Sequence, residues 1–458
     1  MSADPSPLTS ASPPQPAPAR RRFFSRRRVR PLAAGLVVLV CAVVIAGLGY
    51  FVVYPQVDAY RRERRAREEI EDLDFTRARA DLERCLRVRP DSADLHFLLA
   101  RTCRRDGDPD AARAHLREAK RLHWVEEEIS LEYLLLQAEA LLVPRVEQAL
   151  RGYLERGHAD ETLILEALIH GCLQNNRLSD AQHWTSVWTE RHPDDWHGHY
   201  WQGRVFDAGL RYEQAADEYG KALAKNPACR DAHLRLGEDL SKESQFEEAL
   251  PHFERYLEGD PDNAYALLGL ARCQRVLSPP DVTVATLDRV LAANADYLPA
   301  VTLRGQLELD RDNPAEALVW LRRACELNPN YKAANLGMAS ALKLLGKARE
   351  AARYERRGRE IESDYLRVEA LSKRSFADPG NVAARREAGA ILFRLGDTQE
   401  ALQWLVSAFL LDPKDPETKK VLAESLHQLG NRELEERYRA VLEEREAEPD
   451  QSEKGSGR

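Results

Sequence analysis

Aromatic and histidine side chains gather in one stretch of this chain of 458 residues. Four of its seven tryptophans lie there with four histidines and one tyrosine, namely Trp184, Trp188, Trp196, Trp201, His183, His192, His197, His199 and Tyr200. Imidazoles beside carboxylates are ligand types for zinc, whereas clustered Trp and Tyr side chains are typical of protein-binding surfaces. Large rings also fill the interior between helices, so three interpretations have to be compared.

The spacing of the histidines argues against a metal site. A set made of His192, His197 and His199 with Asp194 or Asp195 would lie across a turn, and it matches no recognised ligand spacing. Packing between helices is the favoured interpretation for most of the stretch, and an aromatic binding patch is the second. We therefore expect no bound metal.

Neither the cysteines nor any catalytic motif predicts an enzyme. The seven cysteines show no CxxC or CxxCH spacing, which excludes zinc ribbons and c-type haem, and they are interpreted as small core residues. One disulfide, from Cys85 to Cys103, is an alternative if the repeats lie outside the cytoplasm. The phosphate loop G-x-x-x-x-G-K-[ST], the G-x-S-x-G elbow, H-E-x-x-H and G-x-G-x-x-G before a helix are all missing from the sequence. We expect no catalytic residues and no cofactor.

A fixed interval organises the sequence around these residues. The positions that stand 34 residues apart in otherwise helix-rich sequence are Pro193, Pro227, Pro261, Ala295 and Pro329. Proline ends a helix, and the residues before three of these prolines, Asn226, Asp260 and Asn328, favour turns and caps. Self-similarity of this kind indicates a repeat architecture, in which each unit buries its apolar face only against its neighbours. The sequence therefore predicts an all-α solenoid.

Small and large residues recur in fixed slots between the prolines. In the unit from Arg230 to Asn263 the slots hold His233, Leu236, Gly237, Leu240, Ala249, Phe253 and Pro261. Other units repeat the pattern with Gly203, Phe206, Ala215, Tyr219 and Pro227, and with Gly305, Ala317, Leu321 and Pro329. The pattern resembles the tetratricopeptide (TPR) signature W-x2-L-G-x2-Y, A-x3-F, P, with the Trp and Tyr replaced. A small residue lets the two helices of a pair cross closely, and an aromatic or leucine side chain fills the groove between them.

The interval changes once toward the C-terminus. Pro379 and Pro413 are again 34 residues apart, but Pro329 and Pro379 are separated by 50 residues. The excess of about one helix predicts a lengthened or additional helix between roughly Ala351 and Phe376.

The two ends of the repeat region follow from the same register. The last unit starts at Pro416 and places Glu435 in a small-residue slot, as a solvent-facing terminal cap would. The resemblance implies a TPR superhelix of about ten to eleven helix pairs over residues 57–445, with an irregular phase near 351–379 and a disordered tail at 446–458.

A long apolar segment precedes the repeats. Residues 32–54 carry no charge and are bracketed by Pro31 and Pro55. As a helix they would span about 34 Å, enough for a hydrocarbon layer of about 30 Å. A cleaved signal peptide has a shorter core followed by a small-x-small site, and here bulky residues take that place. The sequence therefore predicts one N-terminal transmembrane helix.

The flanking charges set the expected orientation of this helix. Residues 1–31 hold seven arginines and a single acid, and their Pro, Ala and Ser content is typical of a disordered tail. This cationic flank is expected in the cytoplasm, with the repeats on the other side of the membrane. Arginines between Arg61 and Arg67 on the far flank weaken the assignment.

The repeat region is acidic. The formal net charge of the chain is −8, and because residues 1–31 carry +6, residues 32–458 carry −14. An acidic body argues against nucleic acid as a partner, while the basic tail suits anionic lipid head groups. The expected partners are the membrane and a protein or peptide ligand.

The TPR resemblance also implies which residues bind that ligand. In the family the first helix of each pair lines a concave groove for an extended peptide or a partner helix. The positions carried over are Tyr200, Trp201, Arg204, Arg235, Glu238, Tyr265, Arg272, Arg275 and Gln306. Arg204, Arg235 and Arg272 would offer forked donors to an acidic segment, and the alternative is that they are solvated charges paired with nearby acids. The Lys and Asn clamp of the chaperone-binding members is not found at the matching slots.

These features resemble a membrane-anchored bacterial TPR protein. They predict a scaffold for protein–protein interaction in the assembly of an envelope or secretion complex. Two alternatives stay open, namely a cytosol-facing regulatory adaptor that tethers a soluble complex to the membrane, and a periplasmic TPR subunit of a polysaccharide-export machine.

Overall fold

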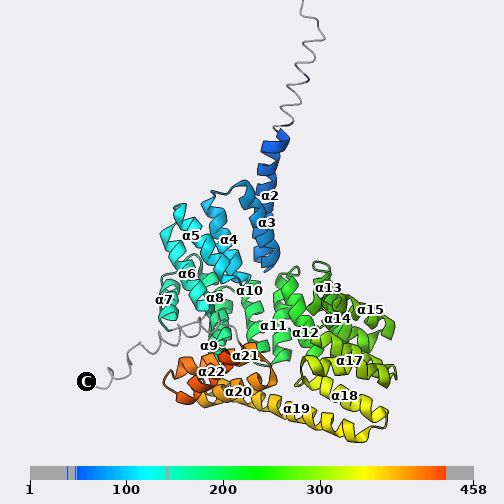
Figure 1. Ribbon diagram of the computed structural model, residues 1–458. Coiled ribbons are helices and arrows are strands. Elements are labelled where there is room, and N and C mark those ends of the chain that lie inside the picture. Colours follow the sequence, from blue (N-terminus) through cyan, green and yellow to red (C-terminus); the bar gives the residue numbers. More distant parts are fainter. Residues whose placement is uncertain (1–38, 40–46, 48, 141–143, 430–458) are drawn as a thin grey trace, which may run out of the picture. The chain divides into compact units, whose positions relative to one another are not determined.

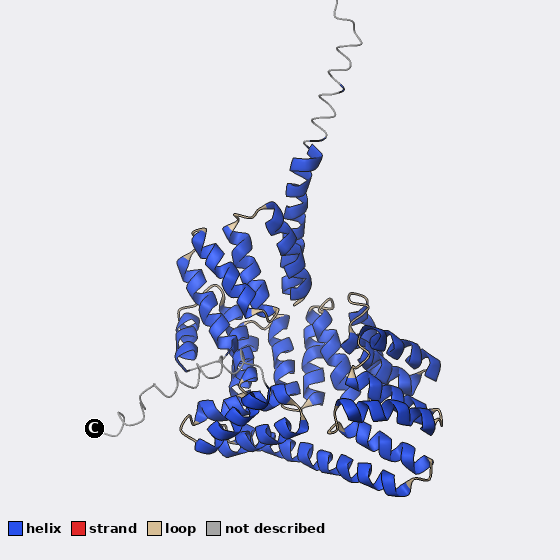
Figure 2. Ribbon diagram, viewed as in Figure 1, coloured by secondary structure: helices blue, strands red, loops and turns tan. Residues whose placement is uncertain are grey.

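The computed structural model describes residues 39, 47, 49–140 and 144–429, and the regular structure in this part of the chain is entirely helical (Figures 1 and 2). The chain forms two compact units, residues 1–61 and residues 62–458. The helix pairs lie in the second unit, apart from residues 54–61 at the start of the first helix.

Short turns connect the helices into pairs. Those of the N-terminal half are α2 (Tyr54–Glu71), α3 (Phe75–Val88), α4 (Ala93–Arg105), α5 (Pro109–Arg121), α6 (Glu126–Ala140), α7 (Pro144–Glu155), α8 (Glu161–Gln174), α9 (Leu178–Arg191), α10 (Trp196–Ala208), α11 (Tyr212–Lys225) and α12 (Arg230–Lys242). Those of the C-terminal half are α13 (Phe246–Leu257), α14 (Ala264–Leu277), α15 (Pro280–Ala293), α16 (Leu298–Asp310), α17 (Pro314–Leu327), α18 (Lys332–Leu344), α19 (Ala348–Ala377), α20 (Val382–Leu395), α21 (Thr398–Leu411) and α22 (Pro416–Leu429). The predicted all-α solenoid is confirmed for the described residues, as ten pairs from α2/α3 to α20/α21 and a final helix α22.

Pro193, Pro227 and Pro329 lie directly after the residue that caps a helix, whereas α13 ends at Leu257, four residues before Pro261. Asn226 caps the C-terminus of α11 immediately before Pro227, and Asn328 caps α17 before Pro329. Because proline lacks an N–H and disfavours helical backbone in the residue before it, each helix stops there.

The small-residue slots bring the helices into close contact, as the sequence predicted. A Cβ atom at Gly203 would lie 2.7 Å from the ring of Tyr219, and one at Gly305 would lie 2.7 Å from Cγ of Leu321. Phe253 fills the space between two successive first helices, with Gly237 on one side and Gly269 on the other. The large residue of each second helix therefore packs against bare backbone of the first helices.

The irregular interval corresponds to one lengthened helix. Helix α19 runs for 30 residues, from Ala348 to Ala377, without a break. Its buried stripe consists of Ala351, Gly358, Ile361, Val368, Leu371 and Ser375. Of the two outcomes that the spacing left open, the structure has the longer helix and no additional one between α18 and α20.

The residue in the turn within a pair adopts left-handed backbone. Positive φ angles occur in these turns at Leu73, Gly107, Asn176, Leu210, Ser244, Asp312, Gly346 and Gly396. Side chains other than glycine cost roughly 1–2 kcal/mol in this conformation. The turn between α14 and α15 is different, because its residue Ser278 has φ −123°.

This contrast gives a test of backbone strain at matched positions. We expect Ser244→Gly, at φ 61°, to raise the free energy of unfolding by about 1 kcal/mol, since glycine relieves the strain. The same change at Ser278, one repeat later, should lower it by about 0.5 kcal/mol through the entropy of glycine. Urea unfolding of both variants measures the two shifts, and shifts of the same sign would contradict the prediction.

The last pairs contact the middle of the solenoid. Arg385 Nη1 on α20 donates to the carbonyl oxygen of Asn176 at 2.8 Å, and Gln403 Nε2 on α21 donates to Gln174 Oε1 at 2.9 Å. Figure 1 shows α20 and α21 beside α9. A cavity of about 200 Å³ lies between α19, the helices α9 and α10 and the turn that follows α10, and Phe376 lines it. The superhelix of residues 62–429 therefore closes on itself.

The described cysteines behave as core residues. Cys103, Cys172, Cys229 and Cys273 are buried free thiols, and burial raises the pKa of Cys172 and of Cys229 to about 12. Since Cys103 is a free thiol, the alternative disulfide to Cys85 is not formed.

Most of the predicted transmembrane segment, residues 32–54, lies outside the described residues, as do Cys41, Glu435 and the tails at 1–31 and 446–458. Its described end is a π-helix, η1 (Gly49–Val53), which continues directly into α2, so that Pro55 lies inside a helix. None of the helices formed by described residues combines the length and the apolar character that crossing a membrane requires.

Candidate functional site

The first helices of four successive pairs carry the predicted binding residues. Helix α10 holds Tyr200, Trp201 and Arg204, α12 holds Arg235 and Glu238, α14 holds Tyr265, Arg272 and Arg275, and α16 holds Gln306. The structure brings these residues into two separate groups. Their binding role stays a prediction.

The first group is a polar network between α10 and α12. The hydroxyl of Tyr200 donates to the Asp231 carboxylate and accepts a hydrogen bond from Arg204 Nη1 at 3.1 Å. Arg235 Nε lies 3.6 Å from Asp231 Oδ2, and its Nη1 lies 3.5 Å from Glu238 Oε2. Arg235 is therefore paired with acids of its own helix, whereas Arg204 contacts a neutral phenol.

The protonation states of these side chains give the network a net positive charge near neutral pH. Burial raises the pKa of Glu238 to about 7, and the charge of Arg235 only partly opposes this effect. Burial would also raise the pKa of Asp231, but the charges of Arg235 and Arg204 and the hydrogen bond from Tyr200 outweigh it, and the pKa falls below its ordinary value. Near neutral pH two guanidinium groups thus face one full and one partial carboxylate charge.

The second group joins α14 to α16. Arg275 Nη1 donates to Gln306 Oε1 at 2.8 Å, and Arg275 Nε lies 2.8 Å from Asp310 Oδ2. Arg272 is exposed, and among the described residues it has no ion pair. Tyr265 is 45% exposed. Helix α14 therefore offers one cation and one ring that the rest of the solenoid leaves accessible.

Two tyrosines near Arg272 were not predicted. Burial raises the pKa of Tyr297 and of Tyr331, and the charge of Arg272 opposes it in both cases. Tyr297 precedes α16 and Tyr331 precedes α18, one repeat apart. The two tyrosines are separated by 34 residues, the same interval as the periodic prolines. The sequence could therefore have identified them by this interval.

The tryptophans of the aromatic stretch mostly fill the core, as the favoured interpretation holds. Trp188 is 1% exposed, and its Nε1 donates to Asp195 Oδ2 at 2.9 Å. Trp184 and Trp201 are also buried. Trp201, predicted as a binding residue, therefore presents little surface to a partner.

The histidines of that stretch do not converge on a metal site. His192 faces Glu161 at 3.4 Å, and His199 faces Glu218 at 2.8 Å. His197 lies against Asp195 at 2.6 Å. Within residues 49–140 and 144–429 no cluster of three or more metal-binding side chains is found.

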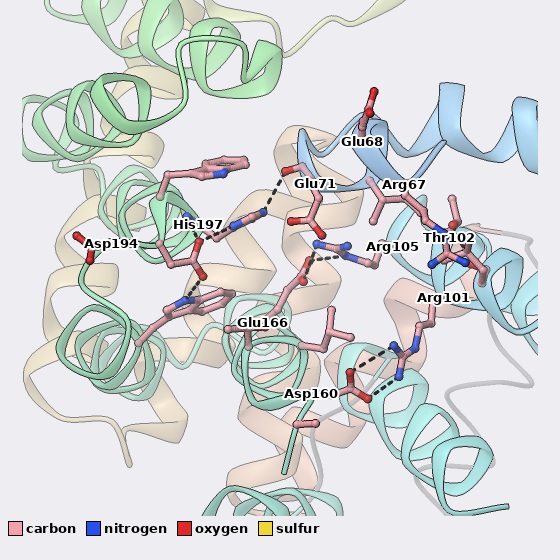
Figure 3. Close-up of a pocket in the computed structure, with 18 of the residues that line it drawn as sticks. Arg67, Glu68, Glu71, Arg101, Thr102, Arg105, Asp160, Glu166, Asp194 and His197 are labelled. Carbon is pink, nitrogen blue, oxygen red and sulfur yellow. Dashed lines mark hydrogen bonds and ion pairs between the residues drawn. The ribbon is translucent and has the colours of Figure 1, made fainter. Parts of the chain in front are cut away.

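A hollow of about 790 Å³ lies among the first helices α2, α4, α8 and α10 (Figure 3). Ion pairs brace its walls: Arg101 Nη2 lies 2.6 Å from Asp160 Oδ2, and Arg105 Nη2 lies 2.8 Å from Glu166 Oε2. The apolar part of its lining consists of Ile70, Leu98, Ala159, Leu163, Trp188 and Trp196.

His197 connects the two sides of this hollow. Its ring stacks on Trp196 at 3.9 Å between centroids. Its Nε2 lies 3.1 Å from the carbonyl oxygen of Glu71 at the end of α2, and this contact joins α2 to α10 (Figure 3). The sequence pointed to this stretch but not to its contact with residues more than a hundred positions away.

A buried ionic cluster involves the helix α4, which also lines the hollow. Arg104 and Glu132 have fully buried side chains and meet at 2.5 Å, and Arg104 also pairs with Glu139. Arg101 Nε lies 3.3 Å from the other oxygen of Glu132. Helices α4 and α6 are therefore joined by charges as well as by apolar packing.

Comparisons with known proteins agree with the repeat architecture. Family models described as tetratricopeptide repeat match residues 64–126, 202–238 and 240–307. A stretch of 100 residues is 30% identical to DnaJ homolog subfamily C member 3 of Rattus norvegicus, covering 22% of this chain and 20% of that protein. The match thus spans about a fifth of that relative's length.

Several solved structures match part of this chain at low sequence identity and low TM-score. MamA is 19% identical, with 36% of this chain and 96% of that chain covered and a TM-score of 0.30. PilW, a type IV pilus biogenesis factor, is 17% identical, with 44% and 93% covered and a TM-score of 0.38. YrrB, a TPR protein, is 22% identical, with 45% and 97% covered and a TM-score of 0.26. The family models and the helix pairs themselves show that this chain carries tetratricopeptide repeats.

Proposed function

We propose that this protein is a scaffold that holds a segment of a partner protein against the first helices of its TPR pairs. The observation that supports this proposal is that charged and aromatic side chains on these helices remain available to contact a partner. Arg204 and Arg272 have no carboxylate partner among the described residues, and Tyr265 is 45% exposed on the same helix as Arg272. The large residues of the second helices are by contrast committed to packing.

The hollow between α2 and α10 supports the same proposal. Its volume of about 790 Å³ is in the range of ligand pockets, roughly 300–1,000 Å³. Its lining of apolar side chains with a few fixed charges suits a bulky side chain of a bound segment.

We further propose that residues 32–54 anchor the scaffold as a single transmembrane helix. The seven arginines of residues 1–31 would keep that end in the cytoplasm and place the repeats outside it. In this arrangement the scaffold would serve the assembly of an envelope or secretion complex. The alternatives are a cytosol-facing adaptor for a soluble complex and a subunit of a polysaccharide-export machine.

One experiment tests both parts. Tyr265→Cys on α14 and Val319→Cys on the second helix α17, where Val319 is 62% exposed, are made in the full chain. Intact host cells are treated with a membrane-impermeant maleimide that carries a photo-crosslinker, and the unaltered chain gives the background of its native thiols. We expect both variants to be labelled, and only the one at position 265 to crosslink to a partner.

Different results would contradict the proposed binding surface and the proposed orientation in the membrane. Equal crosslinking from both positions would remove the first helices as the binding surface. Labelling of both positions only after the cells are lysed would reject the outward orientation and support the cytosol-facing adaptor.

A further inference from the structure

The irregular half of α19 forms one wall of the cavity of about 200 Å³. Helix α19 has 30 residues against the 14 of α17, so residues 362–377 are the part that a regular second helix lacks. The residues of α19 that line the cavity, Glu369, Ser372, Lys373 and Phe376, all lie in this extra part. The cavity therefore depends on the departure from the 34-residue interval.

The cavity is distinct from the groove of the first helices. Its remaining lining comes from the second helix α9, the last part of α10 and the turn that follows α10. Among the lining residues only Val205 belongs to a first helix. A molecule in this cavity would thus use a surface other than the one proposed for the partner segment.

The size and the walls of the cavity suit one aromatic ring. An apolar cavity of about 150 Å³ holds a benzene molecule, so this cavity has room for a ring with one small substituent. Leu178, Val205, Leu210 and Phe376 supply apolar walls. Leu210 is 43% and Phe376 is 40% exposed, so a bound ring would remove apolar surface from water and could contact the Phe376 ring.

Arg211 gives the cavity an uncompensated positive charge. Its side chain is half-buried, its guanidinium carbon lies 4.4 Å from the centre of the Phe206 ring, and its Nε donates to Gln214 Oε1. In the described part of the chain no carboxylate lies at ion-pair distance from it. The other cation of the lining, Lys373, is paired with Glu369 at 2.5 Å. A negatively charged group in the cavity would therefore meet a guanidinium that lacks a counter-charge.

Two neutral polar side chains line the same space. The amide of Gln182 and the hydroxyl of Ser372 make no side-chain hydrogen bond within the described residues. Each can donate to a ligand or accept from it. A mainly apolar cavity with a few polar groups is typical of sites for small molecules.

We propose that this cavity binds a small aromatic acid, with its ring against Leu210 and Phe376 and its acidic group on Arg211. The walls belong to residues 178–211 and 369–376, so the bound molecule joins parts of the chain that are far apart in the sequence. Because it contacts both parts, its binding stabilises the closed form of the superhelix. The inference does not depend on the proposed scaffold function.

The test uses the full-length chain in detergent and isothermal titration calorimetry with three small probes. Benzoate carries both the ring and the charge, benzamide has nearly the same shape without the charge, and acetate has the charge without the ring. We expect one benzoate to bind per chain, benzamide to bind about tenfold more weakly, and acetate to show no saturable binding. Benzoate should also raise the midpoint of thermal unfolding.

A fourth probe identifies the source of the acid. It is a short acetylated peptide that ends in phenylalanine with a free carboxylate, and we expect it to bind more weakly than benzoate because the cavity holds little more than one ring. Tighter binding of the peptide would place the acid at the C-terminus of a partner chain and overturn the assignment to a small molecule.

Variants assign the binding to the cavity. Arg211→Gln should reduce the affinity for benzoate to that for benzamide and leave benzamide unchanged. Ser372→Phe fills the cavity and should abolish the binding of both probes. The matched control is Arg322→Gln on α17, which removes an exposed arginine without an ion pair in the described residues and should change neither affinity.

The outcomes separate this inference from the proposed function. Equal affinity for benzoate and benzamide, a preference that survives Arg211→Gln, or the absence of saturable binding would each overturn it. If Ser372→Phe does not fold, as circular dichroism would show, Arg211→Gln alone decides the matter. The scaffold function itself is decided independently by the crosslinking from position 265.

Discussion

Replacing Arg104 with methionine should lower the free energy of unfolding by about 3–5 kcal/mol. The substitution leaves Glu132, whose side chain is fully buried, and the adjacent Glu139 without their principal counter-charge. Arg101, at 3.3 Å from Glu132, compensates only one of the two acids. Urea unfolding measures the loss, and hydrogen exchange should show it concentrated in α4, α6 and α8.

The loss should also depend on pH. Burial raises the pKa of Glu139 to about 7, while the charge of Arg104 works in the opposite direction. In Arg104→Met that opposition is gone, so the folded state keeps the Glu139 proton to a higher pH than the unfolded chain, whose carboxyl ionises near its ordinary value. Stability lost through this group therefore increases as pH rises, and the difference from the unaltered protein should be larger at pH 8 than at pH 5.

Two further variants define the cause. Arg113→Met removes a surface ion pair with Asp110 on α5 and should change stability by less than about 0.5 kcal/mol. Adding Glu132→Met to Arg104→Met should recover part of the loss, because a buried pair replaced as a whole is tolerated better than one broken. A loss that is the same at both pH values would speak against an ionic origin.

Gly269→Ala should destabilise the repeats by about 1–3 kcal/mol, although alanine is the better helix former by about 1 kcal/mol. The new Cβ would lie 2.3 Å from Cε1 of Phe253, a buried ring that is already held against Gly237 on its other side. The ring has no free space to move into, so the helices α12 and α14 must separate. Thermal and urea unfolding give the size of the effect.

The control is the same substitution where the structure has room. Gly220 lies inside α11 with no other atom within 4 Å of an added Cβ, so Gly220→Ala should raise the free energy of unfolding by about 1 kcal/mol. In the Gly269→Ala background, Phe253→Leu should restore part of the loss. If both alanine substitutions were stabilising, the close approach at Gly269 would not be as tight as described.

Much of the fold was predictable because its local signals repeat. Proline lacks an N–H and disfavours helical backbone in the residue before it, and Pro227 and Pro329, each preceded by Asn, therefore mark helix ends without reference to tertiary structure. The glycine slots were equally readable, since only a small residue permits the approach of Tyr219 to Gly203. The choice between a lengthened and an additional helix in α19 was not local, because both accommodate the same number of residues.

In the candidate site, the sequence alone does not predict which arginines are available to a ligand. Arg204 and Arg235 look alike in the sequence, each with an acid three residues further on. Glu238 remains with Arg235, but Asp207 is taken by Lys242, 35 residues away. Whether an arginine is available to a ligand therefore depends on a contact between repeats, which a periodic pattern does not specify.

The contact of Arg385 with Asn176 joins residues 209 positions apart and restricts how this solenoid can vary. Each helix pair adds a fixed increment of rotation and rise to a superhelix. Inserting or deleting one 34-residue unit between α9 and α20 would carry Arg385 away from its acceptor and open the cavity beside Phe376. Most solenoids tolerate a change in the number of their repeats. In this segment the contact between its first and last helices fixes how many helix pairs can lie between them.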